Sequence, residues 1–358
     1  MMGLSVSAPA GNLPPVQTVF IILMENHKWS DIKGSTDAPY INNTLLPIAS
    51  WCEQYASPLD PSLPNYLWLE AGTNFGINDD NDPSVNHQAS TNHLVALLNR
   101  AGISWKSYQE DISGTYVPLT DTNAYAVRHN PCVYFDDVTG TNDPDDSYGI
   151  AHIRPYGELA SDLANNTVAR YNFITPNLCD DMHDSCAPLF NPVRQGDDWL
   201  SREIPKILES RAYKNGGAVF ITWDESMSGD VPIGMVVLSP LARGGGYFND
   251  VPYSHSSTLR TIEEIFGVSP LLGDAANATD LSDLFATLVI CKPIKNSGGF
   301  EMTIVTADLG KTNLIQASTD LVRWTSISTN FNSTNIFAVM DAGATNFYRR
   351  FYRVLQMP

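Results

Sequence analysis

The sequence predicts an α/β protein, in which a mostly parallel sheet flanked by helices is followed by a small C-terminal antiparallel β domain. From residue 17 to about 290, apolar segments alternate with helical patterns, as they do in chains that form a parallel sheet. Two of these segments are almost entirely apolar and rich in β-branched residues, which is typical of strands buried on both faces. After residue 299 the pattern changes to short alternating strands, which indicate an antiparallel module.

Polar side chains follow both of the strongly apolar strands, which are predicted at 19–24 and 217–223. The residues directly after these strands are Glu25, Asn26, Asp224 and Glu225. Ligands of α/β sheets bind just beyond the carboxyl ends of the strands, so we expect chemistry at this edge. Oxygen ligands from two strands predict a divalent cation held between them. For each strand alone, the acidic residue can equally be a cap of the next helix.

A serine lies in a Pro-bounded turn directly before an apolar, helical segment that ends near Gly72. The positive end of a helix and its free amides favour an alkoxide or a bound phosphoryl group. Ser62 is therefore a candidate nucleophile activated by a metal, and its alternative role is an ordinary helix cap. Asn65 could donate an amide hydrogen to a phosphoryl oxygen or serve only as a turn residue.

The remaining elements of this domain continue the alternation. They are a helix at 91–102, a strand at 103–108, a helix at 199–211, a buried strand at 234–240 and a helix at 258–266. Two long polar loops, at 72–91 and 111–143, interrupt the pattern. Loops of this length in a compact domain usually cover a site or are disordered.

Several motifs occur in an order that resembles the phosphoesterase family. They lie at 19–31, 61–72, 102–110, 129–131, 175–184 and 254–261. That family contains bacterial acid phosphatases and phosphatidylcholine-type phospholipases C, and it is similar to a branch of the alkaline phosphatase superfamily. The resemblance spans about residues 17–290 and implies an alkaline phosphatase-like fold.

The resemblance also implies a set of site residues. A metal is expected on an adjacent Glu-Asn pair, the nucleophilic serine and an adjacent acidic pair, which here are Glu25, Asn26, Ser62, Asp224 and Glu225. His129 and His183 match histidines that the family places around the phosphate. Two-zinc members of the superfamily carry an Asp-x-x-x-His ligand pair, but here Cys179 stands four residues before His183. One divalent metal ion is therefore expected, and the second site stays open.

His255 has three possible roles in this scheme. It could be a third histidine on the phosphate, a ligand of a second metal, or a cap of the helix at 258–266. In the expected reaction, Ser62 attacks phosphorus in line with the leaving alcohol, while His129 and His183 stabilise the phosphoryl oxygens or protonate the leaving group. Water then hydrolyses the phosphoseryl intermediate.

Three functions are compatible with these residues. The first is a metal-dependent phosphomonoesterase similar to acid phosphatases, acting on a small phosphate ester. The second is a phospholipase C-type phosphodiesterase, and the third is a noncatalytic protein that binds a surface polymer. The chain has 39 acidic and 21 basic side chains, for a net charge of −18, so it lacks the basic surface of a nucleic-acid binder. We therefore expect no nucleic-acid partner.

The sequence also bears on localisation. No apolar stretch approaches the roughly 18 residues of a membrane-spanning helix, and residues 1–16 do not have the pattern of a signal peptide. Of the five cysteines, Cys179 and Cys186 flank the segment that contains His183. A disulfide there would fix that histidine and suggests a secreted or periplasmic protein, whereas two reduced thiols would suggest the cytosol.

The expected domains are an N-terminal extension at 1–16, a catalytic domain at 17–290 and a small β-sandwich-like module at 299–358. A polar, glycine-containing break at 292–299 separates the last two. The module loosely resembles C-terminal modules of secreted bacterial enzymes, which implies possible contact with a glycan or a cell surface. Trp324 and Tyr352 could bind such a glycan, but at strand positions they are expected in the core.

Overall fold

The computed structural model describes residues 13–357, apart from 58, 227–231, 287, 297, 307–309 and 335. The chain divides into two compact units. The larger unit is residues 17–284, and the smaller one combines the residues before 17 with residues 285–358. Among the described residues, no helix has both the length and the apolar character needed to cross a bilayer.

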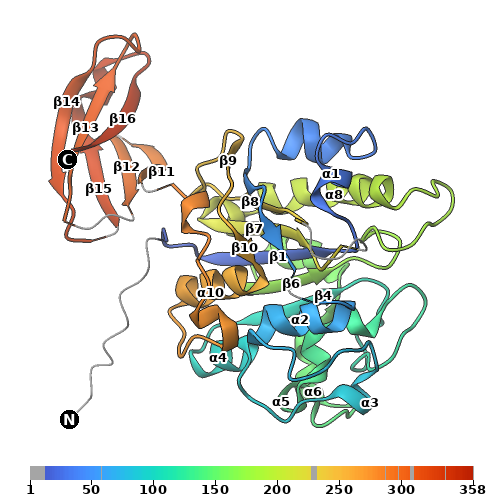
Figure 1. Ribbon diagram of the computed structural model, residues 1–358. Helices are drawn as coiled ribbons and strands as arrows, with labels where there is room; N and C mark the ends of the chain where they lie inside the picture. Colours follow the sequence, from blue (N-terminus) through green and yellow to red (C-terminus); the bar gives the residue numbers. More distant parts are fainter. Residues whose placement is uncertain are drawn as a thin grey trace, which may run out of the picture. The chain divides into compact units, whose positions relative to one another are not determined.

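An eight-stranded, mostly parallel sheet forms the centre of the larger unit, as predicted (Figure 1). The strand order is β5-β4-β6-β1-β7-β8-β2-β9, and β8 is antiparallel to both of its neighbours. The strands are β1 (Thr18–Met24), β2 (Ser50–Cys52), β4 (Trp105–Gln109), β5 (Ile153–Pro155), β6 (Tyr171–Thr175), β7 (Gly217–Trp223), β8 (Met235–Leu238) and β9 (Tyr247–Asn249). A separate two-stranded sheet joins β3 (Tyr55–Ala56) to β10 (Tyr253–Ser254).

The two apolar strands predicted from the sequence lie side by side at the centre of this sheet. Every residue of β1 and of β7 is buried, which explains why neither strand alternates between apolar and polar residues. The two strands are parallel, and their register pairs Met24 with Trp223. The residues that follow, Glu25 and Asp224, are therefore neighbours at the carboxyl edge of the sheet.

Helices cover both faces of the sheet (Figure 1). Helices α2, α4 and α10 lie on one face, and α8 lies on the other. The α-helices are α1 (Trp29–Ile32), α2 (Ser62–Ala71), α3 (Pro83–Asn86), α4 (Leu94–Arg100), α5 (Asp136–Thr139), α6 (Ser147–His152), α7 (Glu158–Asn165), α8 (Pro192–Glu209), α9 (Arg211–Lys214) and α10 (His255–Phe266). Shorter turns of other helix types are η1 (Ile41–Leu45), η2 (Val127–His129), η3 (Pro131–Tyr134), η4 (Gly273–Ala276) and η5 (Ser282–Leu284).

The two long loops predicted from the sequence pack against each other. A backbone bridge joins Gln88 in the first loop to Phe135 in the second. Beside it, His87 Nδ1 lies 2.7 Å from an Asp136 carboxylate oxygen, and His93 Nε2 lies 2.9 Å from Asp137. The loops contain α3, η2, η3 and α5, so they are structured segments.

The smaller unit consists of two three-stranded antiparallel sheets, in the orders β11-β12-β15 and β14-β13-β16. Its strands are β11 (Leu288–Asn296), β12 (Gly299–Thr306), β13 (Thr312–Ser318), β14 (Thr325–Phe331), β15 (Ile336–Asp341) and β16 (Phe351–Met357), and η6 (Ala342–Asn346) precedes the last strand. The core contains Met302, Ile304, Ile315 and Val339. Tyr352 packs against this core, whereas Trp324 is not part of it and lies under the Arg353 guanidinium, 4.3 Å from the ring centroid.

The start of this unit differs from the predicted break at 292–299. Residues 288–296 form the strand β11, which pairs with β12 through a hairpin. Residues 292–296 of the predicted break therefore belong to a strand of the β unit, and the C-terminal part of this unit begins at residue 285. A turn between two strands and a linker between two domains have similar polar, glycine-containing compositions, so composition could not separate them.

Candidate active site

Three buried carboxylates meet at the carboxyl edge of the sheet. Glu25 follows β1, Asp224 follows β7, and Asp181 comes from the loop after β6, the other neighbour of β1. The side chains of all three residues are fully buried. Asn26 adopts a left-handed backbone conformation, with φ of 51°, and its N–H donates to Asp224 Oδ1 at 3.1 Å. This bond ties the ends of β1 and β7 together.

Glu25 lies at the centre of the site and contacts groups from several elements. The Tyr66 hydroxyl, from α2, donates to Glu25 Oε1. The same oxygen is 3.4 Å from His129 Nε2. The Ser62 hydroxyl donates to Glu25 Oε2 at 3.4 Å. The predicted nucleophile and the predicted metal ligand are thus in direct contact.

Ser62 is the first residue of α2, but it does not cap the helix. The N-cap position belongs to Pro61, and no side chain accepts a capping hydrogen bond there. Helix α2 packs against η2, which carries His129, so the start of α2 faces the other site residues. Ser62 is buried, and its hydroxyl points to a carboxylate instead of to the helix backbone. The capping alternative is therefore not supported by the geometry.

His129 lies between two of the carboxylates. Its Nε2 faces Glu25, and its Nδ1 is 3.4 Å from Asp181 Oδ2. The ring stacks on Tyr66, with ring centroids 5.1 Å apart. One ligand atom from each of Glu25, His129 and Asp181 lies within 4.8 Å of the others, so this group could hold a metal ion. We call it the Glu25–His129–Asp181 group.

Asp181 was not among the predicted ligands, although its segment was part of the recognised motif. The sequence offers one signal for Asp181, which is its position after the strand β6. This strand ends at the same edge of the sheet as the strands before Glu25 and Asp224. It was missed because five residues separate it from the end of the strand, and only the folded loop returns it to the edge. The loop is held by Glu25 N–H, which donates to the Asp181 carbonyl at 2.8 Å.

The electrostatics of the site favour a bound cation. Burial, together with the negative charges of Asp224 and Asp181, raises the pKa of Glu25 well above its usual value. Burial likewise raises the pKa of Asp181 and of Asp224. Burial also lowers the pKa of His129 well below its usual value, which keeps the imidazole neutral and able to act as a ligand.

Buried polar atoms without hydrogen-bond partners also favour a bound cation. Within the described part of the chain, His129 Nε2, Asp181 Oδ2 and Asp224 Oδ2 lack a hydrogen-bond partner. In that part, the one basic side chain within 4 Å of Glu25 and of Asp181 is His129, whose lowered pKa leaves it uncharged. Clustered carboxylates are costly to bury without a compensating positive charge. Oxygen and imidazole donors in this arrangement fit a divalent cation such as zinc, manganese or magnesium.

Two of the predicted site residues support the site from one side. Asn65 donates to Glu225 Oε2 at 3.0 Å and to the carbonyls of Leu59 and Pro61 at 2.9 and 3.3 Å. Its amide hydrogens are thus directed at the turn before Ser62 and at Glu225. Burial, followed by the charges of Asp224 and other nearby acids, raises the pKa of Glu225 to about 9. Asn65 therefore holds the turn and Glu225 in place, which matches the second of the two roles that the sequence left open for it.

His255 has a different role from the three that the sequence suggested. Its Nε2 lies 2.6 Å from the Asp224 carbonyl oxygen, which can only accept a hydrogen bond, so Nε2–H is the donor. Its Nδ1 lies 3.2 Å from the Tyr55 hydroxyl. Burial lowers the pKa of His255 to about 4, so the ring is neutral near pH 7. The helix cap is Ser254, which forms a capping box with Ser257. His255 thus fixes the backbone at Asp224.

His183 lies at the more open side of the group. Its ring centroid is 5.8 Å from that of His129, and its Nδ1 is 2.7 Å from an Asp184 carboxylate oxygen. The segment that contains it is closed by a disulfide between Cys179 and Cys186, as expected, while Cys52 and Cys132 are free and buried. The bridge brackets both Asp181 and His183.

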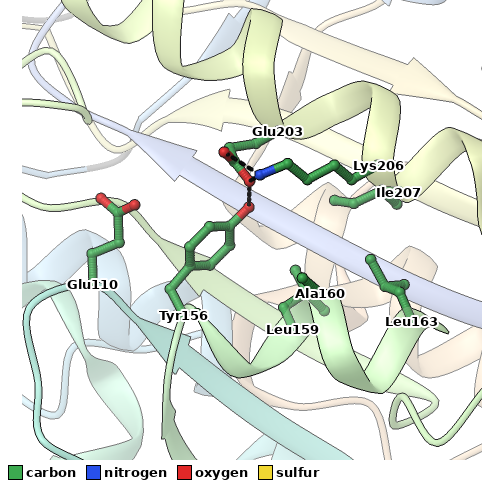
Figure 2. Close-up of a pocket in the computed structure, with 9 residues that line it drawn as sticks. Glu110, Tyr156, Leu159, Ala160, Leu163, Glu203, Lys206 and Ile207 are labelled. Atoms are coloured by element: carbon green, nitrogen blue, oxygen red, sulfur yellow. Dashed lines mark hydrogen bonds and ion pairs between the residues drawn. The ribbon is translucent and has the colours of Figure 1, made fainter. Parts of the chain in front are cut away.

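A carboxylate beyond the site supports the same segment. Glu110 accepts hydrogen bonds from Asn177 N–H at 2.9 Å and from Trp199 Nε1 at 2.8 Å. Asn177 in turn accepts from the N–H groups of Cys179 and Asp180. Glu110 also lines a cavity of about 260 Å³ between α7 and α8, where Tyr156 and Lys206 both donate to Glu203 (Figure 2). This cavity is separate from the Glu25–His129–Asp181 group.

Comparison with known proteins establishes the family. Residues 36–269 match the model of the Phosphoesterase family, which covers more than half of the chain. The chain belongs to this family. It is therefore a phosphoesterase, a hydrolase of phosphoric esters, and the matched region contains Ser62, His129, Asp181 and Asp224.

Individual relatives of this phosphoesterase include enzymes with several names. A phosphatidylinositol-3-phosphatase of Mycobacterium tuberculosis is 30% identical over 79% of this chain and 86% of its own. A phosphate-repressible acid phosphatase of Penicillium chrysogenum is 29% identical over 60% of this chain, which spans only 50% of that protein. Phospholipase C A of M. tuberculosis is 24% identical over 68% of this chain and 56% of its own.

Solved structures also resemble the phosphoesterase at low sequence identity. A protein of the alkaline phosphatase superfamily from Vibrio parahaemolyticus is 10% identical, with a TM-score of 0.49, over 92% of this chain and 87% of its own.

Proposed function

We propose that this phosphoesterase is a metal-dependent phosphomonoesterase that works through a phosphoserine at Ser62. The observation that carries the proposal is the contact between Ser62 Oγ and Glu25 Oε2, at 3.4 Å, inside a cluster of buried carboxylates. A serine held beside groups that can bind a cation is suited to nucleophilic attack on phosphorus. The acid phosphatases among its relatives support the choice of a monoester substrate.

The residues that would hold the metal are Glu25, His129 and Asp181, whose donor atoms converge, together with the neighbouring Asp224. His129 Nε2, Asp181 Oδ2 and Asp224 Oδ2 lack hydrogen-bond partners among the described residues. This proposal moves His129 from the phosphate to the metal. When bound, the cation would supply positive charge that stabilises the Ser62 oxyanion and the phosphoryl oxygens. Neutral His255 would hold the backbone of Asp224 in position throughout.

The remaining residues act on the substrate. Ser62 Oγ would transfer its proton to the Glu25 carboxylate that accepts its hydrogen bond, and would attack phosphorus as the bond to the leaving alcohol breaks. His183, which is partly exposed, would take up a proton at Nε2 once the substrate displaces Arg128 from that atom, and would pass the proton to the departing oxygen. Water would then attack the phosphoserine and release inorganic phosphate, which restores the Ser62 hydroxyl.

The proposal extends to the setting of the enzyme. A disulfide next to the site is typical of proteins in oxidising compartments, which supports a secreted or periplasmic location. We propose a small, soluble phosphate ester as the substrate. Contact of the C-terminal unit with a glycan or a cell surface, and the expected lack of a nucleic-acid partner, stay predictions.

The test is to compare Ser62→Ala with Ser147→Ala, using 4-nitrophenyl phosphate as the substrate. Ser147 is the matched control because it is also the first residue of a helix, α6, but is exposed and distant from the carboxylates. Ser62→Ala should lower kcat by at least about a thousandfold, whereas Ser147→Ala should not change it. Acid quenching of the wild-type reaction, followed by mass spectrometry, should find phosphate on Ser62.

Three outcomes would contradict the proposal. A Ser62→Ala enzyme that keeps more than about a tenth of wild-type kcat rules out covalent catalysis at this residue. If the wild type hydrolyses aryl phosphodiesters much faster than monoesters, the chain is a phospholipase C-type diesterase. A wild type that is inert to both esters would favour a noncatalytic binding protein.

A further inference from the structure

Arg128 directly precedes His129 in η2, and its guanidinium lies at the open side of the site. Its Nη2 is 3.5 Å from His183 Nε2. Two carboxylates also surround it, with Nε 3.8 Å from Asp80 Oδ2 and Nη1 3.7 Å from Asp121 Oδ2. Asp80 and Asp121 belong to the two long loops that pack together, so Arg128 lies where both loops reach the site.

The hydrogen-bonding capacity of Arg128 is mostly unused. A guanidinium has five N–H donors. Among the described residues, the contact with His183 is its one side-chain hydrogen bond, and both ion pairs are longer than a hydrogen bond. Arg154 is a useful comparison, because its side chain is 20% exposed and that of Arg128 is 18% exposed. Arg154 nevertheless donates to both Glu158 oxygens and to the carbonyls of Gly114 and Ile150.

Arg128 is also connected to the nucleophile. The other oxygen of its partner Asp80 accepts the Leu63 N–H at 2.9 Å, and Leu63 directly follows Ser62. The positive charge of Arg128 contributes to the lowered pKa of His129 and acts to lower that of Asp181, so its field reaches the metal-ligand candidates. A partly buried guanidinium with free donors, beside His183 and linked through Asp80 to the residue after Ser62, is suited to an anionic ligand.

We infer that Arg128 binds the phosphoryl oxygens of the substrate and makes the enzyme selective for phosphomonoesters over phosphodiesters. This inference rests on the function proposed above and names the substrate class of the same site. A monoester near neutral pH carries about two negative charges and three terminal oxygens, whereas a diester carries one charge and two terminal oxygens. The forked donors of Arg128 match the additional oxygen and charge of the monoester.

The selectivity is tested with two substrates that share a leaving group, 4-nitrophenyl phosphate and methyl 4-nitrophenyl phosphate. Arg128→Ala should lower kcat/KM for the monoester by about 10- to 100-fold and that for the diester by no more than about threefold. Arg128→Lys should recover part of the loss, because it keeps the charge but not the fork. The inhibition constant of inorganic phosphate should rise as kcat/KM for the monoester falls.

The matched control is Arg194→Ala in α8. Arg194 is exposed and pairs with Asp198 one helical turn away, so its removal should leave both substrates unaffected. Equal losses of Arg128→Ala on the two esters would assign Arg128 a merely structural role. An unchanged monoester rate would overturn the inference directly.

A second variant covers the case in which Arg128→Ala does not fold. Asp121→Asn removes a competing negative charge but keeps the carbonyl oxygen that accepts Val127 N–H at 2.7 Å. Inorganic phosphate should bind this variant more tightly, as measured by the shift of its thermal transition, and unchanged or weaker binding contradicts the inference. Phosphate binding is independent of turnover, so an inert wild type whose phosphate binding still depends on Arg128 would defeat only the proposed function.

Discussion

Asp181 shows how a single side chain can change the chemistry of a site. With Glu25 and Asp224 alone, the carboxyl edge would hold two acids that are tied to their own strands. Asp181 adds a third carboxylate from the far side of β1 and places His129 between two acids. The cost of burying these groups as carboxylates is offset when a cation is bound, so we expect metal affinity to depend on Asp181.

The prediction at this position is that Asp181→Asn lowers metal occupancy by at least about tenfold, since the amide is a neutral and weaker ligand. The measurement is equilibrium dialysis followed by elemental analysis. Asp180→Asn is the matched control, because Asp180 is the adjacent residue but faces Arg202, 3.6 Å away. Equal occupancy in the two variants would place the metal elsewhere.

Glu225 gives a prediction about pH. Its pKa is about 9 in the folded chain against 4.5 in the unfolded chain, because of burial and then the charges of Asp224, Asp60 and Asp80. Between these values the folded state binds more protons than the unfolded state, so stability decreases as pH rises. The thermal transition of the chelated protein should therefore fall from about pH 5 to pH 9.

Glu225→Gln should flatten this fall, and the exposed Glu209→Gln should not. Part of the fall should remain in Glu225→Gln, since burial also raises the pKa of Glu70 and of Glu263 to about 8. If the thermal transitions of wild type and Glu225→Gln fall by the same amount between pH 5 and pH 9, Glu225 does not titrate in this range.

The sequence predicted the residues whose place follows from local pattern and could not predict those placed by long-range contacts. Glu25 and Asp224 come directly after uniformly apolar strands, so their position at the edge followed from the pattern. Asp181 and Arg128 lie in loops whose path depends on partners distant in sequence. The role of His255 was equally inaccessible, because its partners Tyr55 and Asp224 are 200 and 31 residues away.

At the scale of elements, α2 connects the proposed nucleophile to the 272–274 segment. Its C-cap residue Gly72 has φ of 65° and lies against that segment, where the Gly72 carbonyl accepts the Asp274 N–H at 2.9 Å. A Cβ at Gly72 would be 2.4 Å from the Leu272 carbonyl oxygen. The helix that starts at Ser62 is therefore fixed at its far end by a contact between backbones.

We predict that Gly72→Ala destabilises the protein more than Gly102→Ala does. Gly102 has nearly the same φ, 68°, but a Cβ there would meet nothing within 4 Å. Gly102→Ala should cost about 1–2 kcal/mol for the left-handed conformation alone. Gly72→Ala should cost about 1–3 kcal/mol more, because two backbone segments must separate. Denaturant unfolding measures both, and equal values would show that the contact at Gly72 yields easily.

The direction of a strand within the sheet could not be predicted from the hydrophobic pattern of the sequence. The strand expected at 234–240 forms as β8, shortened to Met235–Leu238, but it runs antiparallel to β7 and β2. All four of its residues are buried, and a fully buried antiparallel strand has the same uniformly apolar sequence as a parallel one. Only the short connection from β7, of about a dozen residues, hints at the reversal.

At the scale of the whole molecule, the proposed catalytic residues and the C-terminal unit belong to different parts of the chain. Every residue assigned to the site lies within residues 17–284. The β unit has its own core, built from Met302, Ile304, Ile315 and Val339. Compact units with separate cores generally fold on their own.

A chain that ends after Ala286, just before β11, should therefore fold and hydrolyse 4-nitrophenyl phosphate with a kcat/KM within about threefold of the full-length value. A chain cut near residue 292, at the break expected from composition, would keep half of β11 without its partner strand, so it is less suitable for this comparison. If the shorter chain folds but loses most of its activity, the β unit must contribute to the site.

The disulfide between Cys179 and Cys186 sets an order of events in the maturation of the enzyme. A newly made chain in a reducing compartment lacks this bridge, so the segment that carries Asp181 and His183 has more conformations to lose when it is fixed. Cation loading must then supply that ordering free energy, which weakens the apparent affinity. Oxidation before loading removes the cost. We therefore expect the reduced chain to bind the proposed metal less tightly than the oxidised chain. Under the proposed secreted or periplasmic location, this would keep the hydrolase inactive among the phosphate esters of the cell that makes it.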